Sequence, residues 1–323
     1  NFPNTVIDID VITKKDEIDI AWGVENEVDY FAISFVQNAK DMNNARKLLD
    51  GYKGKLIAKI EKFDAVANID EIIEASDGIM VARGDLGIEV PYYDVPTIQK
   101  MLIKKANLKG IPVITATQML LSMTQNERAT RAEISDVANA VLDGTDVVML
   151  SEESAVGEDP INVVDTMHNI IAKTEGIYNY DKQYEMPYLD EFDVIQATVT
   201  KLADDLKANG ILAITSSGKS ALKMSRYRPR TPIFTFTHKK KVLNSLTAIW
   251  GVEPIGIIKE AQASKMFQKM LKSLDEIGKL KKDGLYVATV GYPVGMPGST
   301  NTIKILTPSE IEYYLNFKEK KSK

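Results

Sequence analysis

Residues 55–89, KLIAKIEKFDAVANIDEIIEASDGIMVARGDLGIE, combine two short apolar runs with a helix-forming segment between them. The apolar runs, Lys55–Ile60 and Gly78–Ala82, predict buried strands, and charged residues follow each run at once. Between them, Asp64–Ser76 carries apolar residues at helical spacing, so we expect a helix there. A strand, helix and strand in this order and of this length predict two neighbouring parallel strands.

The residues after these two strands suggest a metal site. Parallel neighbours end at the same edge of a sheet, about 4.8 Å apart, so Glu61 and Asp85 are expected to share one space with Lys59 close by. Two carboxylates and an ammonium suit a divalent cation that holds a phosphorylated substrate. The alternative is that these charged residues merely belong to solvated loops.

The composition is that of an ordinary folded protein, with 323 residues, 44% of them hydrophobic and 26% charged. A net charge of −5 argues against nucleic-acid partners. The lack of cysteine excludes thiolate nucleophiles and Cys-based zinc sites, and the two histidines leave little room for a Ser-His-Asp triad. Neither a signal peptide nor a long apolar run is evident, so we expect no membrane partner and a cytoplasmic location.

The pattern of the first half predicts five strand–helix units in succession. Further strands are expected at 29–35, 111–115 and 146–150, and helices at 13–26, 39–49, 95–108, 131–142 and 160–175. Apolar strands that all end in polar residues on one side are typical of a (β/α)8 TIM barrel. A complete barrel needs eight units and about 250 residues. Residues 1–177 can therefore form either an open sheet or a partial barrel of strands 4–8.

Tyrosine, acidic residues and proline without periodicity around 178–188 predict a linker to a second, open α/β domain over 178–323. Helices are expected at 192–208, 219–227, 240–250 and 261–277, and strands at 211–215, 232–236, 253–258, 284–290 and 302–306. A long loop, Gly291–Asn301, follows the strand expected at 284–290.

A loop in this second domain has the composition of an anion pocket. It consists of Thr215, Ser216, Ser217, Gly218, Lys219 and Ser220, and it joins a predicted strand to a helix. Hydroxyl groups, a glycine and a lysine at a helix N-terminus can bind a phosphate. The alternative is a Ser/Gly-rich turn that only caps the helix.

Several segments together resemble the pyruvate kinase family. They are Lys59-Ile60-Glu61, DGIMVARGDLG at 77–87, Ala116-Thr117-Gln118-Met119, TRAEISDVANAVLDG at 130–144, Met149–Ser154, the loop 215–220 and Gly298-Ser299-Thr300-Asn301. The resemblance extends over essentially the whole chain. It implies the later part of a pyruvate kinase, with the last five barrel units followed by the C-terminal regulatory domain.

The family transfers a phosphoryl group from phosphoenolpyruvate to ADP, which gives ATP and an enolate that is protonated to pyruvate. The resemblance implies that Glu61 and Asp85 hold Mg²⁺ (or Mn²⁺) and that Lys59 neutralises charge on the transferring phosphoryl group. It also implies a cradle of backbone amides for the substrate carboxylate, formed by Ala82, Arg83, Gly84 and Asp85.

The resemblance assigns three hydroxyl groups to the same pocket. Thr117 is expected where the enolate carbon is protonated, through a water chain that includes Ser151, and Ser34 is expected to line the site. The loop 215–220 corresponds to the family's effector-phosphate loop. Because the positions around Lys279–Asp283 lack the usual ligands for a second phosphate, a sugar monophosphate or AMP is expected rather than a bisphosphate.

Several positions depart from the family pattern. Lys62 stands where asparagine is common, and Ala129 stands where proline is common. Glu152 stands where the family has glycine, and this change affects the expected position of its neighbour Ser151. The family's K⁺ ligands, phosphoryl-holding arginine and lid domain have no counterpart in this chain. We therefore expect a truncated form, inactive alone, of a K⁺-dependent enzyme that is a homo-oligomer, typically a tetramer.

Two other functions remain open at this point. The chain could be a binding module that senses phosphorylated metabolites through residues 215–220 without any catalysis. It could also be a Mg²⁺-dependent enolate lyase, because barrel enzymes of that kind also place Glu and Asp at adjacent strand ends. The lyase has no evident need for the C-terminal domain.

Overall fold

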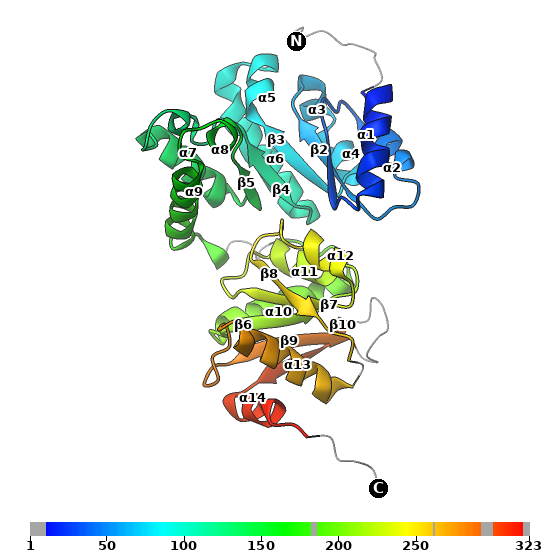
Figure 1. The fold of residues 1–323 in the computed structure, drawn as a ribbon, viewed down its shortest axis with the longest axis vertical. Helices are drawn as coiled ribbons and strands as arrows, with labels where there is room; N and C mark the ends of the chain where they lie inside the picture. Colours follow the sequence, from blue (N-terminus) through cyan, green and yellow to red (C-terminus); the bar gives the residue numbers. More distant parts are fainter. Residues whose placement is uncertain (1–10, 182–185, 261, 292–299, 319–323) are drawn as a thin grey trace. The chain divides into compact units, whose positions relative to one another are not determined.

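The computed structural model describes residues 11–181, 186–260, 262–291 and 300–318. The chain divides into two compact units, Asn1–Asn179 and Tyr180–Lys323, and each has its own sheet surrounded by helices (Figure 1). In the described ranges, no helix has both the length and the apolar character that crossing a membrane requires.

The first unit is built on a five-stranded parallel sheet whose strands neighbour one another in chain order. The strands are β1 (Tyr30–Ile33), β2 (Lys55–Ile60), β3 (Gly78–Ala82), β4 (Val113–Ala116) and β5 (Val147–Met149). The predicted partial (β/α)8 barrel is confirmed, since a barrel also pairs each strand with the next one along the chain.

Helices connect or flank these strands. The α-helices are α1 (Lys14–Glu25), α2 (Ala39–Leu48), α3 (Phe63–Ala67), α4 (Ile69–Ala75), α5 (Arg83–Glu89), α6 (Val95–Lys109), α7 (Arg131–Asp143), α8 (Glu152–Ala155) and α9 (Pro160–Glu175), and the 3-10 turns are η1 (Tyr92–Asp94) and η2 (Leu121–Thr124). The prediction of one continuous helix at 64–76 is wrong, because Asn68 separates two short helices, α3 and α4, in this segment.

The two faces of this sheet have different surroundings. Buried side chains of β1 to β4, such as Leu56 and Val81, form one core with α2, α4 and α6. On the opposite face, Ile57, Met80 and Ala116 form a small separate cluster. Since side chains alternate along a strand, Lys59 lies on the same face as Ile57, away from the helices.

The strand register places four strand ends at one edge of the sheet. Lys59 pairs with Met80, Ala82 with Ala116, and Ala116 with Met149. The residues that follow β2, β3, β4 and β5 therefore emerge side by side, as expected for the functional end of a parallel sheet.

The second unit contains a mixed sheet in the order β10-β9-β6-β7-β8. Its strands are β6 (Gly210–Ile214), β7 (Ile233–Thr237), β8 (Val252–Ile257), β9 (Tyr286–Gly291) and β10 (Thr300–Leu306), and its helices are α10 (Glu191–Asp205), α11 (Lys219–Arg226), α12 (Lys240–Ser245), α13 (Ala263–Glu276) and α14 (Pro308–Leu315). The edge strand expected at 302–306 is confirmed as β10, which is antiparallel to β9. Most of the long loop Gly291–Asn301 lies outside the described residues.

Candidate active site

The end of β2 brings a lysine, a glutamate and a serine together. Lys59 Nζ lies 2.7 Å from Glu61 Oε1 and donates a hydrogen bond to Ser34 Oγ at 2.9 Å. Only 1% of the Glu61 side chain is exposed, and its Oε2 accepts a hydrogen bond from the backbone N–H of Phe35 at 2.8 Å. The turn after β1 is therefore tied to the end of β2, and the predicted grouping of Ser34, Lys59 and Glu61 is observed.

Asp85, the second carboxylate of the predicted metal site, does not lie directly at the end of a strand. Asp85 is the third residue of α5, a short helix that begins directly after β3, and its side chain is half-buried. In the described residues, no group of three or more His, Asp or Glu side chains gathers as a metal site built by protein ligands alone would. Mg²⁺ in proteins is commonly bound by one or two carboxylates, with water and substrate oxygens completing its shell, so the carboxylates of Glu61 and Asp85 suit this ion in type and number.

The backbone amide of Gly84 has a partner that the sequence did not suggest. It donates a hydrogen bond to Thr117 Oγ1 at 2.8 Å, and Thr117 Oγ1 in turn donates to the carbonyl oxygen of Ala116 at 2.6 Å. The expected cradle for a substrate carboxylate is thus partly filled by the Thr117 hydroxyl group in this structure. This contact joins the start of α5 to the end of β4.

Thr117 and Gln118 adopt a backbone conformation that is rare for residues with side chains. Their φ angles are +69° and +54°, both in the left-handed region. For a β-branched residue such as Thr117 this conformation is a marked outlier. Strain of this kind persists only where the surrounding structure holds it, and it is concentrated at functional sites.

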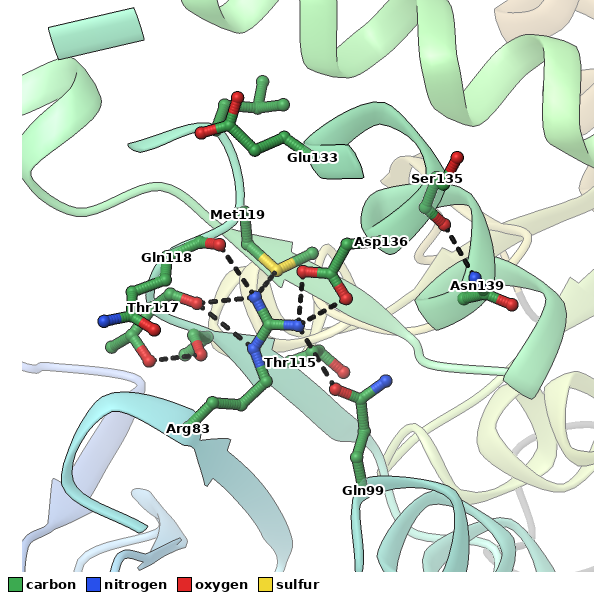
Figure 2. A network of polar contacts seen from close by, with 12 residues as sticks. Arg83, Gln99, Thr115, Thr117, Gln118, Met119, Glu133, Ser135, Asp136 and Asn139 are labelled. Atoms are coloured by element: carbon green, nitrogen blue, oxygen red, sulfur yellow. Dashed lines mark hydrogen bonds and ion pairs between the residues drawn. The ribbon is translucent and has the colours of Figure 1, made fainter. Parts of the chain in front are cut away.

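The side chain of Arg83 holds this turn (Figure 2). Its guanidinium donates hydrogen bonds to the carbonyl oxygens of Thr117, at 2.7 Å and 3.2 Å, and of Gln118, at 3.1 Å, and it lies 2.9 Å from the Met119 sulfur. Asp136, from α7, forms an ion pair with it at 2.6 Å. Sequence reasoning missed this role, because it considered only the backbone amide of Arg83.

Ser151 follows β5 at the same edge of the sheet. Its backbone N–H donates to Glu153 Oε2 at 2.7 Å, and Oε1 of Glu153 accepts from the backbone N–H of Leu120 at 3.1 Å. Glu153 is 1% exposed, so this buried carboxylate joins the end of β5 to the loop after β4. Glu152 is exposed, and Ser151 lies between β5 and α8 as the residue directly before that helix.

The predicted phosphate loop of the second unit forms a compact turn between β6 and α11. The buried Thr215 accepts a hydrogen bond through Oγ1 from the backbone N–H of Gly218 at 2.9 Å, and Gly218 has a φ of +85°. Ser220 Oγ lies 3.1 Å from Thr300 Oγ1. Lys219, the first residue of α11, is exposed, as is Ser217, whereas Ser216 is half-buried.

Comparisons with known proteins identify both halves of the chain. A family model for the barrel domain of pyruvate kinase matches residues 1–164, and a model for its alpha/beta domain matches residues 193–306. A pyruvate kinase of Clostridium acetobutylicum is 43% identical over 312 residues, which cover 94% of this chain and 66% of the relative.

Two other relatives give the same result. A pyruvate kinase of Geobacillus stearothermophilus is 42% identical and covers 96% of this chain, and one of Lactobacillus delbrueckii subsp. bulgaricus is 41% identical and covers 94%. The chain spans 54% and 53% of these two proteins, about half of their length. The chain belongs to the pyruvate kinase family.

Proposed function

We propose that this chain carries the metal-binding, charge-neutralising and proton-transferring residues of a pyruvate kinase, which converts phosphoenolpyruvate and ADP into pyruvate and ATP. The observation that carries the proposal is the group formed by Ser34, Lys59 and Glu61 at the end of β2, at the same edge of the sheet as Thr117, which follows β4 two strands away. On this proposal residues 1–177 form the catalytic part and residues 178–323 the regulatory part of the protein.

Lys59 neutralises the phosphoryl group during its transfer. Its ammonium group is held at a fixed position by Ser34 Oγ and Glu61 Oε1, so no reorganisation is needed when charge develops on the phosphoryl oxygens. Glu61 and Asp85 would hold Mg²⁺ (or Mn²⁺). When bound, this ion neutralises charge on the substrate oxygens as a Lewis acid.

Thr117 is proposed to deliver the proton that converts the enolate into pyruvate. The proton moves from Thr117 Oγ1 to the enolate carbon, and Oγ1 regains a proton from water, with Ser151 in the same water chain. The hydrogen bond from the N–H of Gly84 leaves the Thr117 hydroxyl proton free to point to other acceptors, including the Ala116 carbonyl oxygen that it now binds.

Further properties are proposed from family membership. They are the binding of ADP and ATP, a requirement for K⁺, a homotetrameric assembly and a cytoplasmic location. For the second unit, we propose that the loop 215–220 binds the phosphate of a sugar monophosphate or AMP. The exposed ammonium group of Lys219 and the hydroxyl group of Ser217 support this, because both are accessible to an anion.

The test is pyruvate formation by the full-length protein that contains this chain, with and without ADP. We expect Lys59→Met to abolish phosphoryl transfer and to spare phosphoenolpyruvate binding, because Lys59 acts on charge that develops during transfer. Lys53→Met, at an exposed position shortly before β2, is the matched control and should retain full activity.

The outcomes separate the proposed function from its alternatives. Equal turnover by Lys59→Met and the unchanged protein would refute the role of Lys59. Release of pyruvate without ADP would favour the enolate lyase. Binding of a sugar phosphate in a protein that never forms pyruvate would favour the binding module.

A further inference from the structure

The guanidinium group of Arg83 uses all of its nitrogen atoms in contacts within the first unit. Nε and both terminal nitrogens reach acceptors in the turn after β4 or on α6 and α7. The acceptors are the carbonyl oxygens of Thr117 and Gln118, the Met119 sulfur, Gln99 Oε1 and both carboxylate oxygens of Asp136 (Figure 2). The side chain therefore binds three consecutive residues of one turn.

This turn is the strained part of the site. Thr117 and Gln118 are adjacent residues with positive φ angles, a combination that ordinary L-residues avoid. The free energy that opposes the conformation is of order 1–3 kcal/mol for each residue. Arg83 contacts the carbonyl oxygens of these same two residues, so its hydrogen bonds directly oppose relaxation of the turn.

We propose that the Arg83 side chain is a positioning group, which holds Thr117 and Gln118 in their left-handed conformation and thereby places Thr117 Oγ1 at the substrate. The inference rests on the proposed function, since it assigns Thr117 to enolate protonation. It goes beyond that function because it gives the Arg83 side chain a role, in addition to the role that the family resemblance implies for the Arg83 backbone amide.

Two contacts in opposite directions make the arrangement rigid. The Arg83 side chain reaches from the start of α5 to the turn after β4, and the Thr117 side chain reaches back to the N–H of Gly84. The ends of β3 and β4 are thus joined twice. Movement of the turn would break both connections, so the hydroxyl position depends on the guanidinium.

Charge and shape both require arginine here. Arg83 is 9% exposed and Asp136, which balances its charge, is 38% exposed. A lysine could keep the ion pair with Asp136, but its single ammonium group cannot also reach the carbonyl oxygens of two neighbouring residues in a planar fork. Arg83→Lys therefore removes the hold on the turn while it retains the positive charge.

The first experiment compares Arg83→Lys with a matched buried arginine. Arg226 in the second unit also pairs with a carboxylate, Asp193 at 3.0 Å, and donates to the carbonyl oxygen of Pro187 at 2.9 Å. Arg83→Lys should lower kcat by about 100-fold, as expected for displacement of a reacting group by about 1 Å, and change KM for phosphoenolpyruvate much less. Arg226→Lys should lower the melting temperature and leave kcat per folded molecule unchanged.

A rescue experiment separates positioning from general stabilisation. The Gln118 side chain is exposed, and glycine adopts positive φ without the steric penalty of other residues. Gln118→Gly in the Arg83→Lys background should restore kcat by about tenfold, because the turn then needs less restraint. No recovery, or an unchanged kcat in Arg83→Lys itself, would overturn the proposal.

A measurement on this chain itself does not depend on turnover. The hydrogen exchange rate of the Gly84 amide should rise at least about tenfold in Arg83→Lys, while amides in the strands keep their rates. Unaltered exchange at Gly84 would overturn the positioning role, whether or not the unchanged protein forms pyruvate. Absence of pyruvate formation by the unchanged protein, in contrast, would overturn the proposed function alone.

Discussion

At the scale of single residues, the buried carboxylate of Glu61 sets the charge balance of the site. A carboxylate that is 1% exposed is unfavourable in a protein interior unless it is paired and hydrogen-bonded. Lys59 and the backbone N–H of Phe35 meet this requirement, one at each oxygen atom.

In Lys59→Met the positive charge is lost, so we expect a divalent cation to stabilise that variant more than it stabilises the unchanged protein.

Asp77 links folding stability to pH. Burial opposes ionisation of the Asp77 carboxyl group and by itself would raise its pKa. The hydrogen bond from the Leu56 amide, at 3.0 Å, and the positive charges of Lys55 and Arg46 have the opposite effect. Together they outweigh burial and hold the pKa of Asp77 below its ordinary value of 3.8. Because the pKa is lower in the folded protein, this contribution to stability is fully present above the ordinary pKa. It is lost as the pH falls through the folded pKa.

We therefore predict a pH-dependent effect of Asp77→Asn on the free energy of unfolding of the first unit. The variant should be less stable than the unchanged protein at neutral pH, and the difference should shrink as the pH falls below 3.8. Urea denaturation at a series of pH values measures it, with Asp165→Asn on the exposed face of α9 as the control. A difference that is constant from neutral to acidic pH would contradict the assignment.

Some of the site could be predicted residue by residue, and some could not. The grouping of Lys59 and Glu61 at one strand end follows from the strand pattern, because the ends of parallel neighbours lie together, whereas Ser34 was expected there from the family resemblance. The pair of Arg83 with Asp136 could not be predicted in this way. The two residues are 53 positions apart, and neither local periodicity nor charge pattern indicates which acid an arginine will reach.

At the scale of secondary structure elements, glycine fixes the end of α7. Gly144 has a φ of +97°, and its N–H donates to the carbonyl oxygens of Ala140 and Val141. A Cβ atom at this position would lie 2.7 Å from Asn107 Nδ2. Gly51, in the same unit, has a φ of +80° but nothing within 4 Å of such an atom.

The two glycines thus form a matched pair for substitution. Gly51→Ala should destabilise the first unit by about 1–2 kcal/mol, the penalty for a left-handed conformation. Gly144→Ala should destabilise it further by about 1–3 kcal/mol, because Asn107 must also move. Urea denaturation of both variants measures the difference, and equal losses would show that the contact with Asn107 is relieved without a penalty.

Element positions were predicted well where a local signal exists. Thr13 and Asp16 form a capping box at the start of α1, and Gly110 and Gly144 follow the last residues of α6 and α7, which agrees with the helix ranges expected from the sequence. The division between α3 and α4 was not predicted, since it depends on a distant contact: Asn68 Nδ2 donates to the carbonyl oxygen of Gln37 at 3.0 Å. Helix α14 had a readable signal that was overlooked, a capping box at Thr307 followed by proline.

At the scale of the whole molecule, the chain combines two domains that occur together in one enzyme family. In the described part of the first unit, β1 and β5 each pair with a single neighbouring strand, whereas a closed barrel leaves no strand edge unpaired. The chain also spans 54% of the Geobacillus stearothermophilus relative and 53% of the Lactobacillus delbrueckii relative. We therefore expect phosphoryl transfer from the full-length protein that contains this chain, and none from residues 1–323 alone.

The account depends most on one shared cation. Anomalous diffraction from crystals of the full-length protein, grown with Mn²⁺ and a non-reactive analogue of phosphoenolpyruvate, locates this ion directly. We predict one Mn²⁺ that is bound by a carboxylate oxygen of Glu61 and one of Asp85, with Lys59 facing the phosphate group of the analogue. An ion bound by neither carboxylate, or by one of them with the other directed away, would contradict the account.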